Sequence, residues 1–337
     1  MKIVQQLPAL AQGGVETVVC DLNRALVGCG CESVVSSCGG PLVERIERDG
    51  GRHVRLALKS KNPLTYCQRA WKLRKFLQTE RPDLVCVHSR VPAWLFVGAN
   101  RTLGLKWITY AHGANSVSRY SAVMTKGDRV IVPSQFLADY LKANYRLGDE
   151  RIRIVPNAVD TTRFDPDRLD AEFIAAKRRE WGIEPGDKVT MAIGRITPVK
   201  GLEALIGALG PGEKLVIVGG ADRHHLRYLA NLKALAAGKP VVFAGAQERI
   251  PECLAIADEV VSGNTTKPET FGLSVVEAFA MNKPVRLARR FGGAAEVLAA
   301  VERLQAPSLR SAVIALYSPE RQLERTLAVY REALDMV

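Results

Sequence analysis

Short apolar runs alternate with longer segments of helical periodicity along nearly the whole chain. In the first half, these runs predict strands at residues 2–6, 33–36, 53–57, 84–88, 107–110, 129–132 and 153–155. Apolar residues three and four apart predict helices at residues 15–27, 64–79 and 135–144. Strands and helices that alternate in this way are typical of a parallel sheet with crossover helices.

The alternation breaks at residues 156–170, a turn-rich stretch that contains two prolines. It restarts with predicted strands at residues 189–193, 215–218, 241–243, 259–261 and 285–287. We therefore expect an α/β fold of two Rossmann-like doubly wound parallel-sheet domains, residues 1–155 and 171–315, joined by residues 156–170 as the linker. Residues 316–337 predict a C-terminal helix that could pack back on the first domain.

The motif Gln12-Gly13-Gly14 follows the first predicted strand and opens the first predicted helix. Two glycines let a ligand approach the backbone, and a helix N-terminus offers free amides to a phosphate. The motif is neither a P-loop nor the Gly-x-Gly-x-x-Gly fingerprint, because both the spacing and the following residues differ. A phosphate-facing turn at Gly13 and Gly14 and a plain strand-to-helix turn therefore both remain open.

Two cations follow the first predicted strand of the second half. Arg195 and Lys200 flank a proline-containing loop that leads into a helix. Arginine offers a planar fork and lysine a point charge, so the two side chains can converge on one pyrophosphate. The alternative is a capped loop with two solvated cations.

Residues 268–278 carry two glutamates eight positions apart. Glu269 falls in a predicted loop, where its carboxylate can accept hydrogen bonds from sugar hydroxyls. Glu277 falls about one turn into the helix that opens at Gly272, where it can accept from a ribose diol. The amides of Gly272 and Leu273 would face a diphosphate. A solvated surface position is less favoured for Glu277, because the residues around it are apolar.

The glycine pair, the loop with Arg195 and Lys200, and the segment with Glu269 and Glu277 occur in the order found in family 4 glycosyltransferases. The chain resembles that family over roughly residues 1–300. The family's fold is the GT-B type, in which two Rossmann-like domains face a central cleft. Residues 156–164 also resemble its linker motif. The resemblance implies that Arg195 and Lys200 bind the donor diphosphate. It further implies that Glu269 contacts the sugar and Glu277 the ribose.

The resemblance extends to two places in the first half. Gly14, next to Gly13, would lie against the phosphate. His112, in a His-Gly pair after a predicted strand, would lie near the transferred sugar, although a lone loop histidine is more often structural. We expect the catalytic residues to be His112, Arg195, Lys200 and Glu269. Residues expected to bind the nucleotide-sugar donor are Gly13, Gly14, Arg195, Lys200, Gly272, Leu273 and Glu277.

The resemblance implies transfer of a hexose or heptose with retention of anomeric configuration. No cofactor or metal is expected, because Arg195 and Lys200 would neutralise the leaving diphosphate in place of Mg²⁺. Asp165 and Asp167 imitate the Asp-x-Asp metal motif of other glycosyltransferases, but they fall in the predicted linker.

Positive charge is concentrated in the first half of the chain. Residues 1–165 hold 24 Lys and Arg against 14 Asp and Glu, a balance of +10, whereas residues 166–337 hold 23 against 21, a balance of +2. This favours an anionic acceptor, such as a phosphorylated or lipid-linked glycan, and peripheral contact with an anionic membrane through residues 59–74. A basic surface without a partner is the alternative. Nucleic acid is not expected, since only 6% of residues are aromatic.

No apolar run approaches the ~20 residues that a membrane span needs. The first predicted strand starts at residue 2 without a signal peptide, and seven cysteines lack a Cys-x-x-Cys pair, which indicates reduced thiols. We therefore expect a cytoplasmic protein, located at the cytoplasmic face of the inner membrane. The resemblance and the basic first half together imply a role in lipopolysaccharide or cell-envelope polysaccharide synthesis. After residue 296 the chain departs from the family pattern. This departure leaves a catalytically idle GT-B subunit as the alternative.

Overall fold

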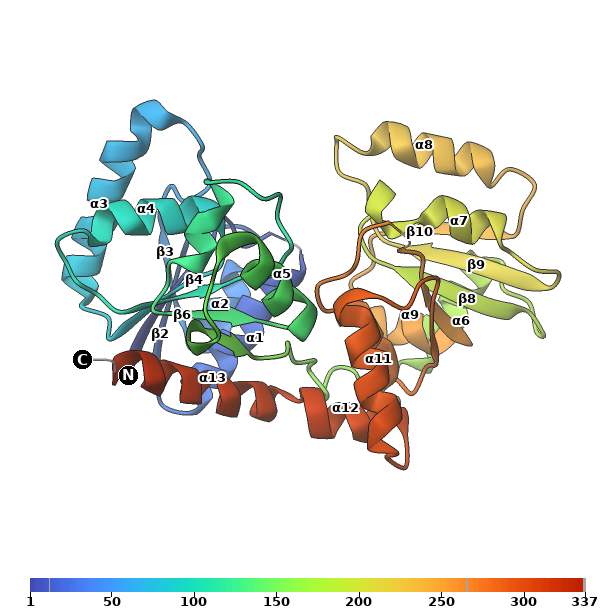
Figure 1. Cartoon of the computed structure of the whole chain (residues 1–337). Helices are drawn as coiled ribbons and strands as arrows, with labels where there is room; N and C mark the ends of the chain where they lie inside the picture. The colour runs from blue at the N-terminus through green and yellow to red at the C-terminus, as the bar shows by residue number, and fades with distance from the viewer. Residues whose placement is uncertain (12, 265, 336–337) are drawn as a thin grey trace. The chain divides into compact units, whose positions relative to one another are not determined.

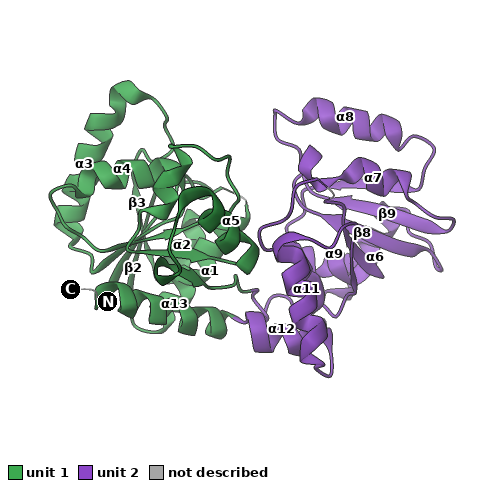
Figure 2. Ribbon diagram, viewed as in Figure 1, with its two compact units in different colours: residues 1–158, 319–337 green, residues 159–318 purple. Residues whose placement is uncertain are grey.

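The computed structural model describes residues 1–11, 13–264 and 266–335, and it divides the chain into two compact units (Figures 1 and 2). Unit 1 comprises residues 1–158 and 319–337, and unit 2 comprises residues 159–318. Each unit is an α/β domain with a parallel sheet, which confirms the predicted fold class.

Unit 1 contains a seven-stranded parallel sheet in the order β3-β2-β1-β4-β5-β6-β7. Its strands are β1 (Lys2–Gln6), β2 (Glu32–Ser37), β3 (Arg52–Arg55), β4 (Leu84–Val87), β5 (Trp107–Tyr110), β6 (Arg129–Val132) and β7 (Ile152–Ile154). The prediction of residues 53–57 for the third strand is wrong at its end, because the register pairs Arg55 with Ser37, the last residue of β2.

Helices cover both faces of this sheet. They are α1 (Gly14–Gly28), α2 (Val43–Arg48), α3 (Tyr66–Glu80), α4 (Arg90–Asn100), α5 (Gln135–Tyr145) and α13 (Pro319–Leu334), with short 3-10 turns η1 (Pro63–Thr65), η2 (Ser121–Thr125) and η3 (Asp149–Arg151). The two-residue period of β4 separates two cores. Val85 and Val87 pack with α3 and α4, whereas Leu84 and Cys86 pack with α1 and α13.

The C-terminal helix α13 belongs to unit 1. Its Tyr330 hydroxyl lies 2.9 Å from that of Tyr110, and its Glu332 accepts hydrogen bonds from Arg129 and Arg153 at 3.2 and 2.8 Å. The predicted start at residue 316 is too early, because Tyr317 packs edge-on against Phe271 in unit 2.

Unit 2 contains a five-stranded parallel sheet in the order β10-β9-β8-β11-β12. Its strands are β8 (Lys188–Ile193), β9 (Glu213–Val218), β10 (Val241–Gly245), β11 (Glu259–Ser262) and β12 (Val285–Leu287). Its helices are α6 (Ala171–Glu180), α7 (Leu202–Gly207), α8 (Leu226–Leu235), α9 (Ile250–Ile256), α10 (Leu273–Ala280), α11 (Gly292–Leu304) and α12 (Leu309–Tyr317), with the 3-10 turn η4 (Pro198–Lys200).

Most of the predicted linker packs into unit 2. Phe164 is buried in the core around α10 and α12, the amide of Val159 donates to Tyr317 O at 3.0 Å, and Arg310 donates to Thr161 O at 2.8 Å. These contacts are long-range in sequence, so a turn-rich composition could not reveal them. The boundary between the units consequently lies after Ala158.

Candidate functional site

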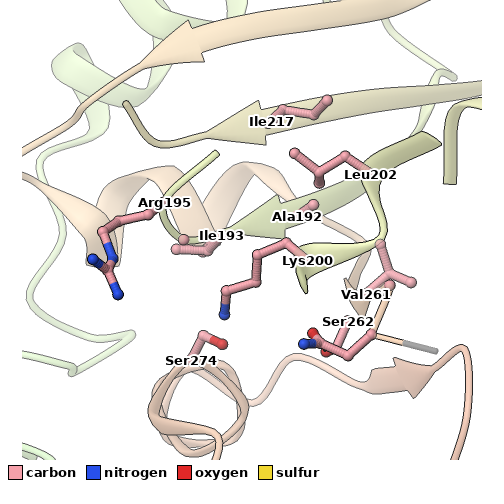
Figure 3. A pocket seen from close by; sticks show the side chains of 12 residues that line it. Ala192, Ile193, Arg195, Lys200, Leu202, Ile217, Val261, Ser262 and Ser274 are labelled. Carbon is pink, nitrogen blue, oxygen red and sulfur yellow. The ribbon is translucent and has the colours of Figure 1, made fainter. Parts of the chain in front are cut away.

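A pocket opens in unit 2 at the carboxyl ends of β8 and β11. Ligands of open α/β sheets bind at this edge. Figure 3 shows Arg195 and Lys200, from the loop after β8, extending into the same space, with Ser274 of α10 facing them. The lining residues are Ala192, Ile193, Gly194, Arg195, Lys200, Leu202, Ile217, Val261, Ser262, Gly263, Asn264 and Ser274.

Two glycines shape the loop that carries both cations. Gly201 has φ +60°, and a Cβ there would lie 1.9 Å from Gly263 O, so only glycine lets the loop pass the end of β11. At Gly194, a Cβ would lie 3.2 Å from Nζ of Lys200. The loop therefore fits closely around the lysine and directs its ammonium group into the pocket.

Lys200 and Glu269 form an ion pair inside the site. Each side chain keeps about a quarter of its surface exposed, 27% for Lys200 and 25% for Glu269. The loop of Glu269 is fixed from behind, because the amide of Gly293 in α11 donates to Glu269 O at 2.8 Å. The structure thus brings together two charges that lie 69 residues apart in sequence.

Asn264 braces the same loop, and the sequence analysis did not identify it. Its side chain is buried, with 4% exposed, and donates to Val199 O at 2.8 Å, while its Oδ1 accepts from the Ser262 hydroxyl at 2.9 Å. The signal in the sequence is that Gly263-Asn264 comes one residue after the predicted strand at 259–261, where parallel sheets place ligand sites.

The start of α10 forms the opposite wall of the pocket. Gly272 precedes the helix with φ +91°, and Leu273 is its first residue. Ser274 lines the pocket, and Glu277, three residues later, lies on the same half-buried face. The first turn of α10 and two cations therefore line one pocket, an arrangement suited to a diphosphate.

In unit 1, Gly14 begins α1 and Gly13 precedes it, whereas Gln12 lies outside the described residues. A Cβ at Gly14 would meet nothing within 4 Å, so chain packing does not require glycine there. The open backbone is compatible with approach of a ligand. The neighbouring position differs, since a Cβ at Gly13 would lie 2.5 Å from the Glu16 carboxylate.

His112 follows β5 and contacts a second histidine. Its Nε2 lies 3.0 Å from Nδ1 of His88, which follows the neighbouring strand β4. Burial lowers the pKa of His112 to about 4. Burial, and then the charge of His112, hold the pKa of His88 well below its usual value. Both imidazoles are consequently neutral at pH 7.

The possible metal motif has a structural role. Asp165 pairs with Arg310 at 3.4 Å, and its Oδ1 accepts from the amide of Asp167 at 3.1 Å, so the first carboxylate closes a turn. Within residues 1–11, 13–264 and 266–335, no group of three or more His, Cys, Asp or Glu side chains is placed to hold a metal ion.

The structure therefore places Arg195, Lys200, Glu269, Gly272, Leu273 and Glu277 around one edge of unit 2, and Gly13, Gly14 and His112 in unit 1. All seven cysteines are free thiols, of which Cys29 and Cys67 are exposed. No helix in the described ranges has both the length and the apolarity to cross a membrane.

Comparison with known proteins identifies two family matches that together cover most of the chain. Residues 12–163 match the model for Glycosyltransferase Family 4, and residues 173–312 match the model for Glycosyl transferases group 1.

Curated relatives include the D-inositol 3-phosphate glycosyltransferase of Segniliparus rotundus, 29% identical over 63% of this chain and 54% of that protein. The enzyme of the same name from Nocardia farcinica is 33% identical over 51% of this chain and 39% of its own length. The alpha-monoglucosyldiacylglycerol synthase of Streptococcus pneumoniae is 28% identical over 47% of this chain and 36% of that protein. The chain thus spans about half or less of the length of these relatives.

Solved structures show the same fold across the whole chain. A glycosyltransferase from Rickettsia africae superposes with a TM-score of 0.85 at 24% identity, over 100% of this chain and 99% of that one. The HepE protein of Anabaena, solved with UDP-glucose, gives a TM-score of 0.81 at 18% identity, over 98% of this chain and 100% of that one. These neighbours have the two-domain GT-B fold.

Proposed function

Since this chain belongs to the family 4 glycosyltransferases, we propose that it transfers a sugar from a nucleoside diphosphate sugar to an acceptor. The observation that supports this most strongly is the pocket at the carboxyl ends of β8 and β11. There, Arg195 and Lys200 face Ser274 in the first turn of α10, so two cations lie beside the positive end of a helix dipole. A donor diphosphate carries the matching negative charge.

The Lys200–Glu269 pair prepares the site for this donor. The two groups satisfy each other before binding, and a partly exposed pair of this kind is worth only ~1 kcal/mol or less. A diphosphate competes effectively for the ammonium group, because it carries more charge than one carboxylate. Release of Lys200 then leaves Glu269 available to accept hydrogen bonds from the sugar hydroxyls.

The remaining residues bind the rest of the donor in this proposal. Glu277 accepts from the ribose hydroxyls, and the amides of Gly272 and Leu273 face the diphosphate. From unit 1, Gly14 and Gly13 approach the phosphate, and His112 lies near the transferred sugar. The binding of UDP-glucose by the HepE protein supports a nucleotide-sugar donor for this fold.

The reaction we propose is a retaining transfer of a hexose or heptose by front-face attack. The bond between the anomeric carbon and the diphosphate oxygen breaks, while the acceptor oxygen bonds to the same carbon from the same face. Arg195, Lys200 and the α10 amides stabilise the negative charge that develops on the leaving diphosphate. The diphosphate oxygen takes the acceptor's proton. The two cations perform the charge neutralisation for which other glycosyltransferases use a metal.

The acceptor in this proposal is an anionic or lipid-linked glycan of the cell envelope, reached at the cytoplasmic face of the inner membrane. Residues 59–75 hold six Lys and Arg and no Asp or Glu. Next to them, Leu64 is 91% and Trp71 is 53% exposed. Exposed cations beside exposed apolar side chains are suited to an anionic bilayer surface. Arg69 does not contribute, because it is buried and donates to Ser60 O and Asn62 O.

A transfer assay tests the proposal. The purified chain is incubated with UDP-, GDP-, ADP- and CDP-sugars in EDTA, with membrane lipid extract as acceptor, and release of the nucleoside diphosphate is followed. We expect one base to support release, with the anomeric configuration of the product retained. Absence of both transfer and donor hydrolysis for every donor would favour the idle GT-B subunit instead.

A further inference from the structure

His88 is a deeply buried titratable group in direct contact with His112. Only 3% of its surface is exposed, and its ring stacks on Tyr110 with centroids 4.5 Å apart. Its Nδ1 makes the 3.0 Å hydrogen bond to Nε2 of His112. Its own Nε2 is buried and has no hydrogen-bond partner among the described residues.

These contacts determine where the shared proton lies. If His112 donated through Nε2, neutral His88 would carry its own proton on Nε2, as an unpaired N–H in the interior. Buried N–H groups without a partner are rare and costly, and a bare nitrogen lone pair is the lesser penalty. A charged His88 is excluded by the cost of burying an unpaired cation. His88 therefore donates through Nδ1, and Nε2 of His112 accepts.

We propose that His88 is a positioning residue that holds the His112 imidazole in one orientation and one tautomer, with the His112 proton on Nδ1. The inference rests on the proposed function, in which His112 lies at the transferred sugar. Because its Nε2 accepts from His88, His112 cannot act as a base through that nitrogen. This agrees with the diphosphate taking the acceptor's proton.

The first test measures the tautomer directly, without activity. Long-range ¹H–¹⁵N spectra of the full chain, labelled in its five histidines, distinguish protonated from bare ring nitrogens. We expect His112 and His88 each to carry the proton on Nδ1 in the wild type. In His88→Phe, whose ring can still stack on Tyr110, the His112 signals should change towards a tautomer mixture. A wild-type His112 with its proton on Nε2 would overturn the proposal.

The second test asks whether His88 acts through His112. His88→Phe should lower kcat about tenfold, the effect of one lost hydrogen bond, with the donor KM within about twofold. His88→Asn, whose amide can donate from the place of Nδ1, should recover most of that loss. In a His112→Ala background, His88→Phe should cost nothing further. If His88→Phe still lowered kcat about tenfold in the His112→Ala background, the role of His88 would be purely structural, which would contradict the proposal.

The two hypotheses fail in different ways. If the wild-type chain transfers no sugar, the proposed function is wrong, while the tautomer spectra still decide whether His88 positions His112. If transfer occurs and the spectra show the other tautomer, only the positioning role is wrong.

Discussion

The polar side chains at the carboxyl edges of the two parallel sheets differ in charge and in burial. In unit 2, this edge carries the exposed Arg195 and the partly exposed Lys200–Glu269 pair. In unit 1, the corresponding edge carries His88 and His112, both neutral, with His88 almost fully buried. Charged groups suit a diphosphate that enters with its own counter-charge, whereas a neutral, rigid pair suits the orientation of an uncharged sugar. The same fold thus supplies two edges that differ in charge and in burial.

The largest expected effect comes from removing a charge at the unit 2 edge. Lys200→Ala should lower the rate of transfer about 10²–10³-fold, because the charge on the leaving diphosphate loses its stabilising cation. The melting temperature should hardly change, since a partly exposed pair contributes ~1 kcal/mol or less.

Lys188→Ala is the matched control for this variant. Lys188 lies at the other end of β8 and also pairs with a glutamate, Glu213, at 2.7 Å. Its loss should leave transfer unchanged. Equal losses in the two variants would mean that the edge of the sheet has no special role.

A second prediction concerns the backbone that carries the charges. Gly201→Ala should destabilise unit 2 by more than about 2 kcal/mol and abolish donor binding, because the new Cβ meets Gly263 O. Gly238→Ala is its control, with φ +74° and nothing within 4 Å of the added Cβ. Gly238→Ala should lower the free energy of unfolding by only about 1 kcal/mol and leave donor binding intact. Chemical denaturation measures the stability of both variants, and nucleotide titration measures their donor binding. Equal losses in Gly201→Ala and Gly238→Ala would show that backbone strain alone is responsible, without the contact to Gly263 O.

The unit 1 edge predicts a dependence of stability on pH. The folded-state pKa of His88 and His112 lies below the unfolded value of about 6.5. The unfolded chain therefore binds more protons as pH falls from about 6.5 towards 4, and the stabilisation present above pH 6.5 is lost over that window.

The melting temperature of unit 1 should therefore fall by several degrees between pH 7 and pH 5. This decrease should be smaller in a variant that carries both His88→Phe and His112→Ala. An unchanged slope in the double variant would contradict burial of two neutral imidazoles.

The smallest expected effect is at the basic surface of unit 1. Trp71 and Lys75 are exposed on α3, with the ammonium 4.0 Å from the ring centroid. Trp71→Ala with Lys72→Glu and Lys75→Glu should weaken sedimentation with anionic vesicles by roughly 1 kcal/mol per charge, while binding of soluble nucleotide stays the same. If the wild type and the variant sedimented equally with anionic vesicles, or if the wild type showed no preference for anionic over neutral vesicles, the membrane contact would be contradicted.

Local sequence pattern predicted the strands and the loops at their ends, because periodicity and glycine placement are properties of neighbouring residues. It could not predict that Lys200 pairs with Glu269, that Asn264 braces the cation loop, or that His88 contacts His112. These contacts depend on β11 lying beside β8 and β4 beside β5. Arg69 shows the same limit, since helical charge periodicity does not reveal that it turns inwards to carbonyl oxygens. The donor and catalytic roles of the nine site residues remain predictions.

The most direct test of the account is calorimetric titration of UDP, GDP, ADP and CDP into the full chain in EDTA, repeated with Arg195→Ala and Lys200→Ala. The account predicts that one nucleoside diphosphate binds without metal and that each substitution weakens its binding at least tenfold. Undiminished binding in both variants, or no binding of any nucleotide to the wild type, would contradict the claim that the charged edge of unit 2 holds the donor diphosphate.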